Sequence, residues 1–147
     1  MNKFLELLSN RTLWCSLTAW FISQFIKYII SGYRTRSWSL RNFWGSGGMP
    51  SAHTASVISL TMNAGLKNGF SSTLFAACTI FSIIVMYDAM GVRRETGKQG
   101  SVINMLLNIT APDEEVDMKE RIGHTPLEVA AGTAVGIVCA LLFAALP

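Results

Sequence analysis

Long hydrophobic runs separated by short polar stretches set the pattern of this chain. No charged residue occurs in residues 68–87 or 129–147, and each run is close to the roughly 20 residues with which a helix crosses a bilayer. Residues 12–30 form a third run, apolar except for Gln24 and Lys27. Lys27 lies near enough to the end of this run to extend its ammonium group to the headgroups. We therefore expect three membrane spans; helices buried in a soluble core are the alternative.

A shorter and more polar helix is predicted for residues 51–66. Ser51 can cap its start, and His53 lies on its apolar face together with Val57 and Leu60. The serine and threonine residues of this segment suit a helix that packs among other helices rather than one that faces lipid.

Small residues in the last run favour close contact between helices. Gly132 and Gly136 are four positions apart, as are Ala130 and Ala134, and small residues at this spacing let two helix backbones approach each other. Such a face can bind another helix of the same chain or of a second copy, so a homo-oligomer is among the partners considered.

The remaining segments are predicted to be loops or short helices. Residues 31–50 are basic and rich in glycine, residues 91–100 are densely charged, and residues 111–120 are acidic, so we expect solvated loops. SVINMLLNI, residues 101–109, is too short to cross a membrane and is expected to be re-entrant, interfacial or packed beneath the charged loops. The predicted fold class is an all-α integral membrane helical bundle, a single domain over residues 1–147 with about four main helices plus one or two short helices.

Composition also indicates a membrane protein. Hydrophobic residues make up 50% of the chain and charged residues only 14%, against about 25% charged residues in soluble domains. The three cysteines lie far apart inside apolar segments, so we interpret them as packed thiols rather than as disulfides or metal ligands. We expect membrane lipids as partners and no nucleic acid.

The order of the predicted elements can bring the two histidines of the chain, His53 and His124, to one side of the membrane. If residues 51–66 and 72–90 are antiparallel, the basic loops next to them emerge on the side of His53. His124 lies on the same side if residues 97–121 do not cross the membrane. The basic residues of these loops are Arg34, Arg36, Arg41, Arg93, Arg94, Lys98 and Arg121.

Two helix starts and several arginines together form an anion site. Helix N-termini offer free backbone N–H groups and a positive dipole end, and guanidinium groups match the oxygen atoms of phosphate. The alternative is that these residues only follow the positive-inside pattern and bind anionic headgroups.

The two histidines add chemistry to this site. One imidazole can attack phosphorus and form a phosphohistidine, while the other protonates the departing alcohol. A helix N-terminus favours the neutral, nucleophilic form at His124, and bound phosphate favours the protonated form of the acid, His53. Glu128 is one helical turn after His124 and can orient its ring; as an alternative, Glu128 completes a capping box with Thr125.

Three segments of the chain carry a resemblance to a known family. GGMPSAHTASV, IVMYDAMGVRRETGKQ and RIGHTPLEVAAG closely resemble the divergent branch of the type 2 phosphatidic acid phosphatase superfamily, which is related to acid phosphatases and vanadium haloperoxidases. In the parent superfamily, a Lys-x6-Arg-Pro motif and an arginine before the second histidine hold phosphate. Pro-Ser-Gly-His supplies the acid, and His-x3-Asp supplies the nucleophile and its orienting carboxylate.

The resemblance implies roles for individual residues here. His53, in Pro50-Ser51-Ala52-His53, corresponds to the acid, and His124 and Glu128 correspond to the nucleophile and its orienter. The residues implied in phosphate binding are Arg121, which stands three positions before His124, Arg34 and Arg41, which reproduce the spacing of the first motif, and Ser51, Arg93, Arg94 and Lys98. The resemblance also implies a metal-independent phosphatase without a cofactor.

We therefore expect a multi-pass phosphatase, in a bacterial cytoplasmic membrane, that removes phosphate from a lipid phosphate or pyrophosphate through a phosphohistidine intermediate. Phosphatidate, phosphatidylglycerophosphate and polyprenyl pyrophosphate present the same headgroup chemistry. A non-catalytic membrane protein that binds or carries anionic lipids is the alternative, and a vanadium-dependent oxidation is a third hypothesis.

We predict that the catalytic face is cytoplasmic, because this side holds all of the 12 Lys and Arg residues except Lys3, Arg11 and Lys67. A single cysteine at Ser46, in a chain whose own cysteines are replaced, should resist an impermeant maleimide on intact cells and react after lysis. Strong labelling of intact cells would reverse the orientation.

Overall fold

The computed structural model describes residues 2–39, 43, 47–110, 118 and 123–146. In these residues the chain forms helices and no strand. The helices are α1 (Lys3–Leu8), α2 (Arg11–Thr35), α3 (Ala52–Asn68), α4 (Thr73–Met90), α5 (Val92–Thr110) and α6 (Pro126–Ala145).

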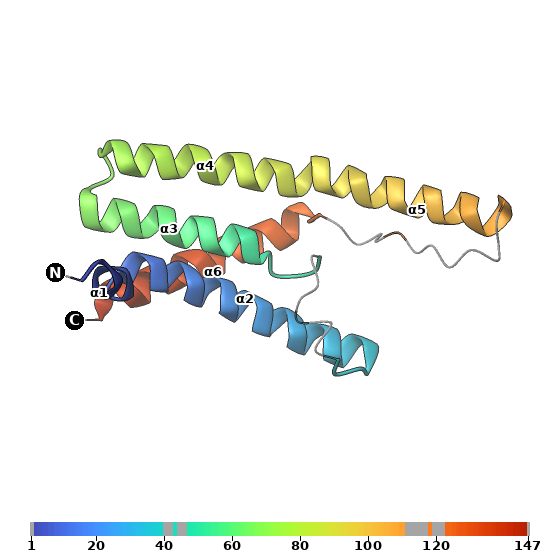
Figure 1. Cartoon of the computed structure of the whole chain (residues 1–147), viewed down its shortest axis with the longest axis horizontal. Helices are drawn as coiled ribbons and strands as arrows, with labels where there is room; N and C mark the ends of the chain where they lie inside the picture. Colours follow the sequence, from blue (N-terminus) through green and yellow to red (C-terminus); the bar gives the residue numbers. More distant parts are fainter. Residues whose placement is uncertain (1, 40–42, 44–46, 111–117, 119–122, 147) are drawn as a thin grey trace.

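Helix α3 lies at the centre of the bundle and packs against α2, α4 and α6. Both chain termini lie at one end of the molecule, and the starts of α3 and α6 point toward the other end (Figure 1). Three helical stretches are long and apolar enough to cross a membrane: α2, α6 and the stretch Thr73–Thr110 that contains α4. The prediction of an all-α membrane bundle is confirmed.

Local capping groups set the starts of the main helices. The side chain of Ser51 accepts a hydrogen bond from the N–H of Thr54 and caps α3, as predicted. Ser72 caps α4 in the same manner, and Thr125 caps α6, with Pro126 in the first turn. These side chains satisfy N–H groups that the first turn of a helix leaves without a partner.

Small side chains fill the interior. The largest fully buried side chains are those of Thr54, Cys15, Ser23, Ser51 and Ser59, while many large hydrophobic side chains, including Phe21 and Leu142, are exposed. Lipid solvates such exposed side chains, and small residues inside allow the helices to pack closely. The cysteines are free thiols, as expected from the sequence.

The contact between α3 and α6 is especially close. A Cβ atom on Gly132 would lie 2.5 Å from the carbonyl oxygen of Ser51, and one on Gly136 would lie 2.7 Å from the carbonyl oxygen of Ala55. The predicted small-residue contact is therefore formed within the chain. Ala130, on the other small-residue face, is exposed.

Hydroxyl groups link α3 to α4 inside the bundle. The Oγ1 atom of Thr61 lies 2.8 Å from the Oγ atom of Ser82, and it donates to the carbonyl oxygen of Cys78. Ser82 in turn donates to the carbonyl oxygen of Val57. The polar residues of α3 thus bind neighbouring helices, as expected for a helix packed among others.

The expectation of a loop at residues 91–100 is wrong, because residues 92–100 form the first half of α5. SVINMLLNI is the second half of the same helix, which continues the line of α4 beyond the starts of α3 and α6 (Figure 1). Glycine costs only about 1 kcal/mol in a helix, so Gly97 and Gly100 do not break it, and Lys98 supports it by pairing with Glu95 one turn away.

The start of the segment that returns from α5 toward α6 falls outside the described residues, as does nearly all of the acidic stretch predicted to be a solvated loop. Met118 is described. Its N–H donates to the side-chain oxygen of Asn104 over 2.8 Å, and its carbonyl oxygen accepts from the side-chain nitrogen of Asn104 over 2.9 Å. This pair of bonds holds Met118 beside Asn104 of α5.

We predict that Gly132→Ala destabilises the bundle, because its new Cβ atom would collide with the carbonyl oxygen of Ser51. This oxygen belongs to the backbone at the start of α3, so it cannot shift without moving the helix. Overpacking costs roughly 1–3 kcal/mol, so the midpoint of thermal unfolding in detergent should fall by several degrees. Ala134→Leu adds a larger side chain at an exposed position of the same helix and should leave the midpoint unchanged. Equal midpoints for Gly132→Ala and the native protein would contradict the close contact.

Candidate active site at the starts of α3 and α6

His124 is fixed by backbone contacts just before α6. Its N–H donates to the carbonyl oxygen of Ala89 at the end of α4 over 2.8 Å. The preceding Gly123 has φ +91°, and a Cβ atom there would lie 2.4 Å from the backbone nitrogen of Arg94. Glycine is required for both the conformation and the close approach, so His124 is held against the junction of α4 and α5.

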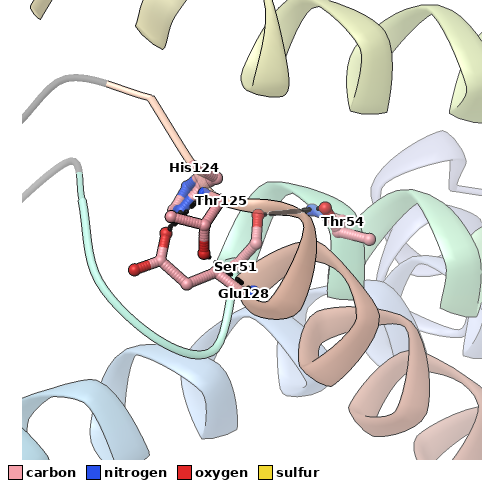
Figure 2. A network of polar contacts seen from close by, with 5 residues as sticks. All are labelled: Ser51, Thr54, His124, Thr125 and Glu128. Atoms are coloured by element: carbon pink, nitrogen blue, oxygen red, sulfur yellow. Dashed lines mark hydrogen bonds and ion pairs between the residues drawn. The ribbon is translucent and has the colours of Figure 1, made fainter.

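Glu128 orients the His124 ring and also caps α6. Its Oε2 atom lies 3.1 Å from Nδ1 of His124 and accepts the N–H of Thr125 over 3.0 Å, while the N–H of Glu128 donates to Oγ1 of Thr125 (Figure 2). The two roles considered from the sequence, orienter and member of a capping box, are thus filled by the same carboxylate.

Ser51 joins the start of α3 to the start of α6. Its N–H donates to the carbonyl oxygen of Glu128 over 3.0 Å. Its Oγ atom accepts from both the N–H and the hydroxyl group of Thr54 (Figure 2). Ser51 is fully buried, so its hydroxyl group acts as a cap here and does not line an open surface.

The two histidine rings face each other across this junction. His53 is the second residue of α3 and is exposed, whereas His124 is only 2% exposed. Their ring centroids are 6.3 Å apart. The Nε2 atom of His124 is buried and has no hydrogen-bond partner among the residues that the structure describes.

Arg93 is the arginine of the predicted set that the structure brings to the histidines. Its Nε atom forms an ion pair with Asp88 at 2.5 Å, and its charge acts on both rings.

Lys27 is the main residue that sequence reasoning missed. We expected it to extend toward the headgroups, but the structure buries it, with 6% exposed, beside Gly48 and close enough to act electrostatically on both histidines and Glu128. One signal was available: Lys27 and Arg34 have the Lys-x6-Arg spacing of the first superfamily motif, with Thr35 in place of proline.

The other basic candidates that the structure describes are Arg34, Arg94 and Lys98. Arg34 and Arg94 are exposed, and Lys98 lies farther along α5, where it pairs with Glu95 at 2.6 Å. Arg41 and Arg121 lie outside the described residues. Nowhere in the described part of the chain do three His, Cys, Asp or Glu side chains form a group that could hold a metal ion.

Comparison with known proteins identifies the family. The model of the Divergent PAP2 family matches residues 8–139. The chain belongs to the divergent PAP2 family. The uncharacterized membrane protein YuiD of Bacillus subtilis (strain 168) is 38% identical over 158 aligned residues, which cover 95% of this chain and 98% of that protein. No solved structure matches the chain.

In this divergent PAP2 protein, the surroundings of His124 favour its neutral form. Burial lowers the pKa of His124 below its ordinary value, and the charges of Lys27 and Arg93 act in the same direction. The hydrogen bond to Glu128 and the charge of this carboxylate oppose the shift. From the helix dipole we expected the pKa of His124 to be lowered as well. Burial is the largest cause of the lowering in this structure.

We predict that Glu128→Gln lowers the pKa of His124 further, because it removes the negative charge that opposes the shift. Glutamine still completes a capping box, so the start of α6 is retained. NMR of protein labelled in the histidine rings should resolve His53 and His124, and a His53→Gln variant assigns the two sets of signals. Following these signals through a pH titration then gives the pKa of each histidine. An unchanged or raised pKa of His124 in the glutamine variant would show that the carboxylate does not act on the ring.

Proposed function

We propose that this divergent PAP2 protein is a metal-independent membrane phosphatase that hydrolyses a lipid phosphate or pyrophosphate. One observation carries the proposal: the Nδ1 atom of His124 is held by Glu128, and its Nε2 atom is left without a partner among the described residues, beside His53. A ring that is oriented through one nitrogen, while the other makes no hydrogen bond to the described residues, is suited to nucleophilic attack.

In the proposed reaction, the lone pair on Nε2 of His124 attacks phosphorus. The bond from phosphorus to the leaving oxygen breaks, and His53 donates its proton to that oxygen, so that a lipid alcohol or lipid monophosphate leaves. Water then attacks the phosphohistidine, and His53 accepts a proton from the water. The bond between phosphorus and Nε2 breaks, which releases inorganic phosphate and restores His124.

Positive groups around the histidines stabilise the phosphate in this proposal. Lys27 and Arg93 supply charge, and the N-termini of α3 and α6 contribute their dipoles. Arg34, Arg94, Arg41 and Arg121 remain proposed phosphate ligands, whereas the distance of Lys98 along α5 and the capping role of Ser51 make these two weaker candidates. We retain the cytoplasmic orientation as part of the proposal.

The burial of His124 favours one alternative. A nucleophile that is only 2% exposed suits a protein that binds anionic lipids at His53 and Arg93 without turnover. Self-association is a further proposal, limited to the exposed Ala130 and Ala134, because Gly132 and Gly136 pack against α3.

We predict that the two histidines differ in their dependence on the leaving group. His124→Ala should abolish phosphate release from every substrate, because the nucleophile is needed whichever alcohol departs. His53→Ala should slow hydrolysis of a lipid monophosphate by about 100- to 10,000-fold and should affect p-nitrophenyl phosphate much less, because nitrophenolate leaves without a proton. Phosphate release by purified protein in detergent measures both.

Equal losses on the two substrates would mean that His53 binds phosphate or supports the fold. Release of phosphate from no member of a panel of lipid phosphates and pyrophosphates, together with retained lipid binding, would favour the non-catalytic alternative. Glu128→Gln serves as an intermediate control, since it keeps the cap and should be less damaging than His124→Ala.

A further inference from the structure

A groove of about 360 Å³ runs along α3 between α2 and α4. Its apolar lining consists of Trp20, Val57, Phe81, Ile84 and Val85. Phe81 and Ile84 are 52% and 60% exposed, so the groove opens to the outside of the bundle. Because α4 is part of a membrane-spanning stretch, this opening faces the hydrocarbon region of the bilayer.

The polar residue along the groove does not require a polar ligand. Ser56 contributes to the lining, but its hydroxyl group donates to the carbonyl oxygen of Ala52 within α3 over 2.9 Å. A hydroxyl group satisfied in this way is compatible with an apolar neighbour.

One end of the groove coincides with the candidate active site. His53, Asp88 and Arg93 form this end, and Asp88 holds Arg93 through its Nε atom. Phe81 lies seven residues before Asp88 on α4, so the apolar part extends about 10 Å from the charged end at 1.5 Å per residue. The groove therefore complements a molecule with an anionic head and a hydrocarbon chain.

We propose that this groove holds one hydrocarbon chain of a lipid phosphate whose phosphate group lies at His53. The inference rests on the proposed function, because it places the substrate phosphate between the same two histidines. It adds two features of substrate binding. The hydrocarbon chain enters laterally from the bilayer between α2 and α4, and the groove accommodates a single chain.

The volume of the groove sets this limit. At about 360 Å³, the groove is near the lower end of the roughly 300–1,000 Å³ of small-molecule sites, and its apolar part is about 10 Å long at 1.5 Å per residue of α4. Two acyl chains of ordinary length do not fit. Any second chain of a substrate stays in the bilayer, outside the groove.

The groove positions the chain and adds little affinity. A chain that leaves the bilayer exchanges one apolar environment for another, so its transfer free energy is small. The position of the phosphate group, in contrast, matters strongly, because a misplacement of about 1 Å can cost on the order of 100-fold in rate. Filling the groove should therefore impair substrates that carry a chain and spare those that do not.

A pair of neighbouring substitutions on α4 tests this consequence. Ile84→Trp fills the groove and should slow hydrolysis of dodecyl phosphate by about 10- to 100-fold, with a much smaller loss for p-nitrophenyl phosphate. Ile83→Trp places the same side chain at an exposed position outside the groove lining and should change neither rate. In the native protein, the rate for alkyl phosphates should rise with chain length and level off once the chain extends past the roughly 10 Å of the groove.

A binding measurement tests the groove without turnover. In a His124→Ala protein that retains Trp20 as its single tryptophan, with phenylalanine at Trp14, Trp38 and Trp44, a brominated alkyl phosphate in vesicles should quench Trp20 fluorescence. It should do so more strongly than the corresponding brominated alcohol at the same mole fraction, because the phosphate holds the chain in the groove. A protein that retains only Trp14 should show equal quenching by the two lipids.

The two experiments distinguish a wrong assignment of the groove from a wrong assignment of phosphatase activity. Equal quenching of Trp20 by phosphate and alcohol, or equal effects of Ile84→Trp on both substrates, would overturn the groove inference. Preferential quenching by the phosphate, in a protein whose native form releases no phosphate from any substrate, would support the groove and reject the proposed hydrolysis.

Discussion

The close approach of α6 to α3 is the contact on which the candidate site depends. Gly132 and Gly136 bring the α6 backbone against carbonyl groups of α3, and the N–H of Ser51 donates to the carbonyl oxygen of Glu128 where the helices begin. Since His53 and His124 lie at these two starts, the same contact sets the 6.3 Å separation of their rings. Larger residues at either glycine would move the histidines apart.

Burial of charge beside the histidines is the second constraint. Lys27 is 6% exposed, and burying a charged group is costly unless opposite charge compensates it. Glu128 provides part of this compensation, and bound phosphate would provide more. The positive charge of Lys27 beside the histidines is compatible with the anionic substrate that we propose.

Glu128 shows how a short motif serves structure and chemistry together. The carboxylate that orients His124 also accepts the N–H of Thr125 in the capping box, so the ring is aligned by the start of α6 itself. His53 likewise belongs both to the proposed catalytic pair and to the lining of the groove that would position a lipid chain.

The sequence by itself determined the features that depend on neighbouring residues. Long apolar runs marked the spanning helices, and Ser51 and Thr125 marked the starts of α3 and α6, because spanning length and capping are local properties. The helical state of residues 92–100 was missed, since single glycines and charges do not distinguish a loop from an exposed helix. Only the tertiary structure decided that Lys27 turns inward and that His53, His124 and Arg93 meet. A lysine near the end of an apolar helix can extend to the headgroups or to a buried carboxylate, and packing against α3 and α6 selects between these outcomes.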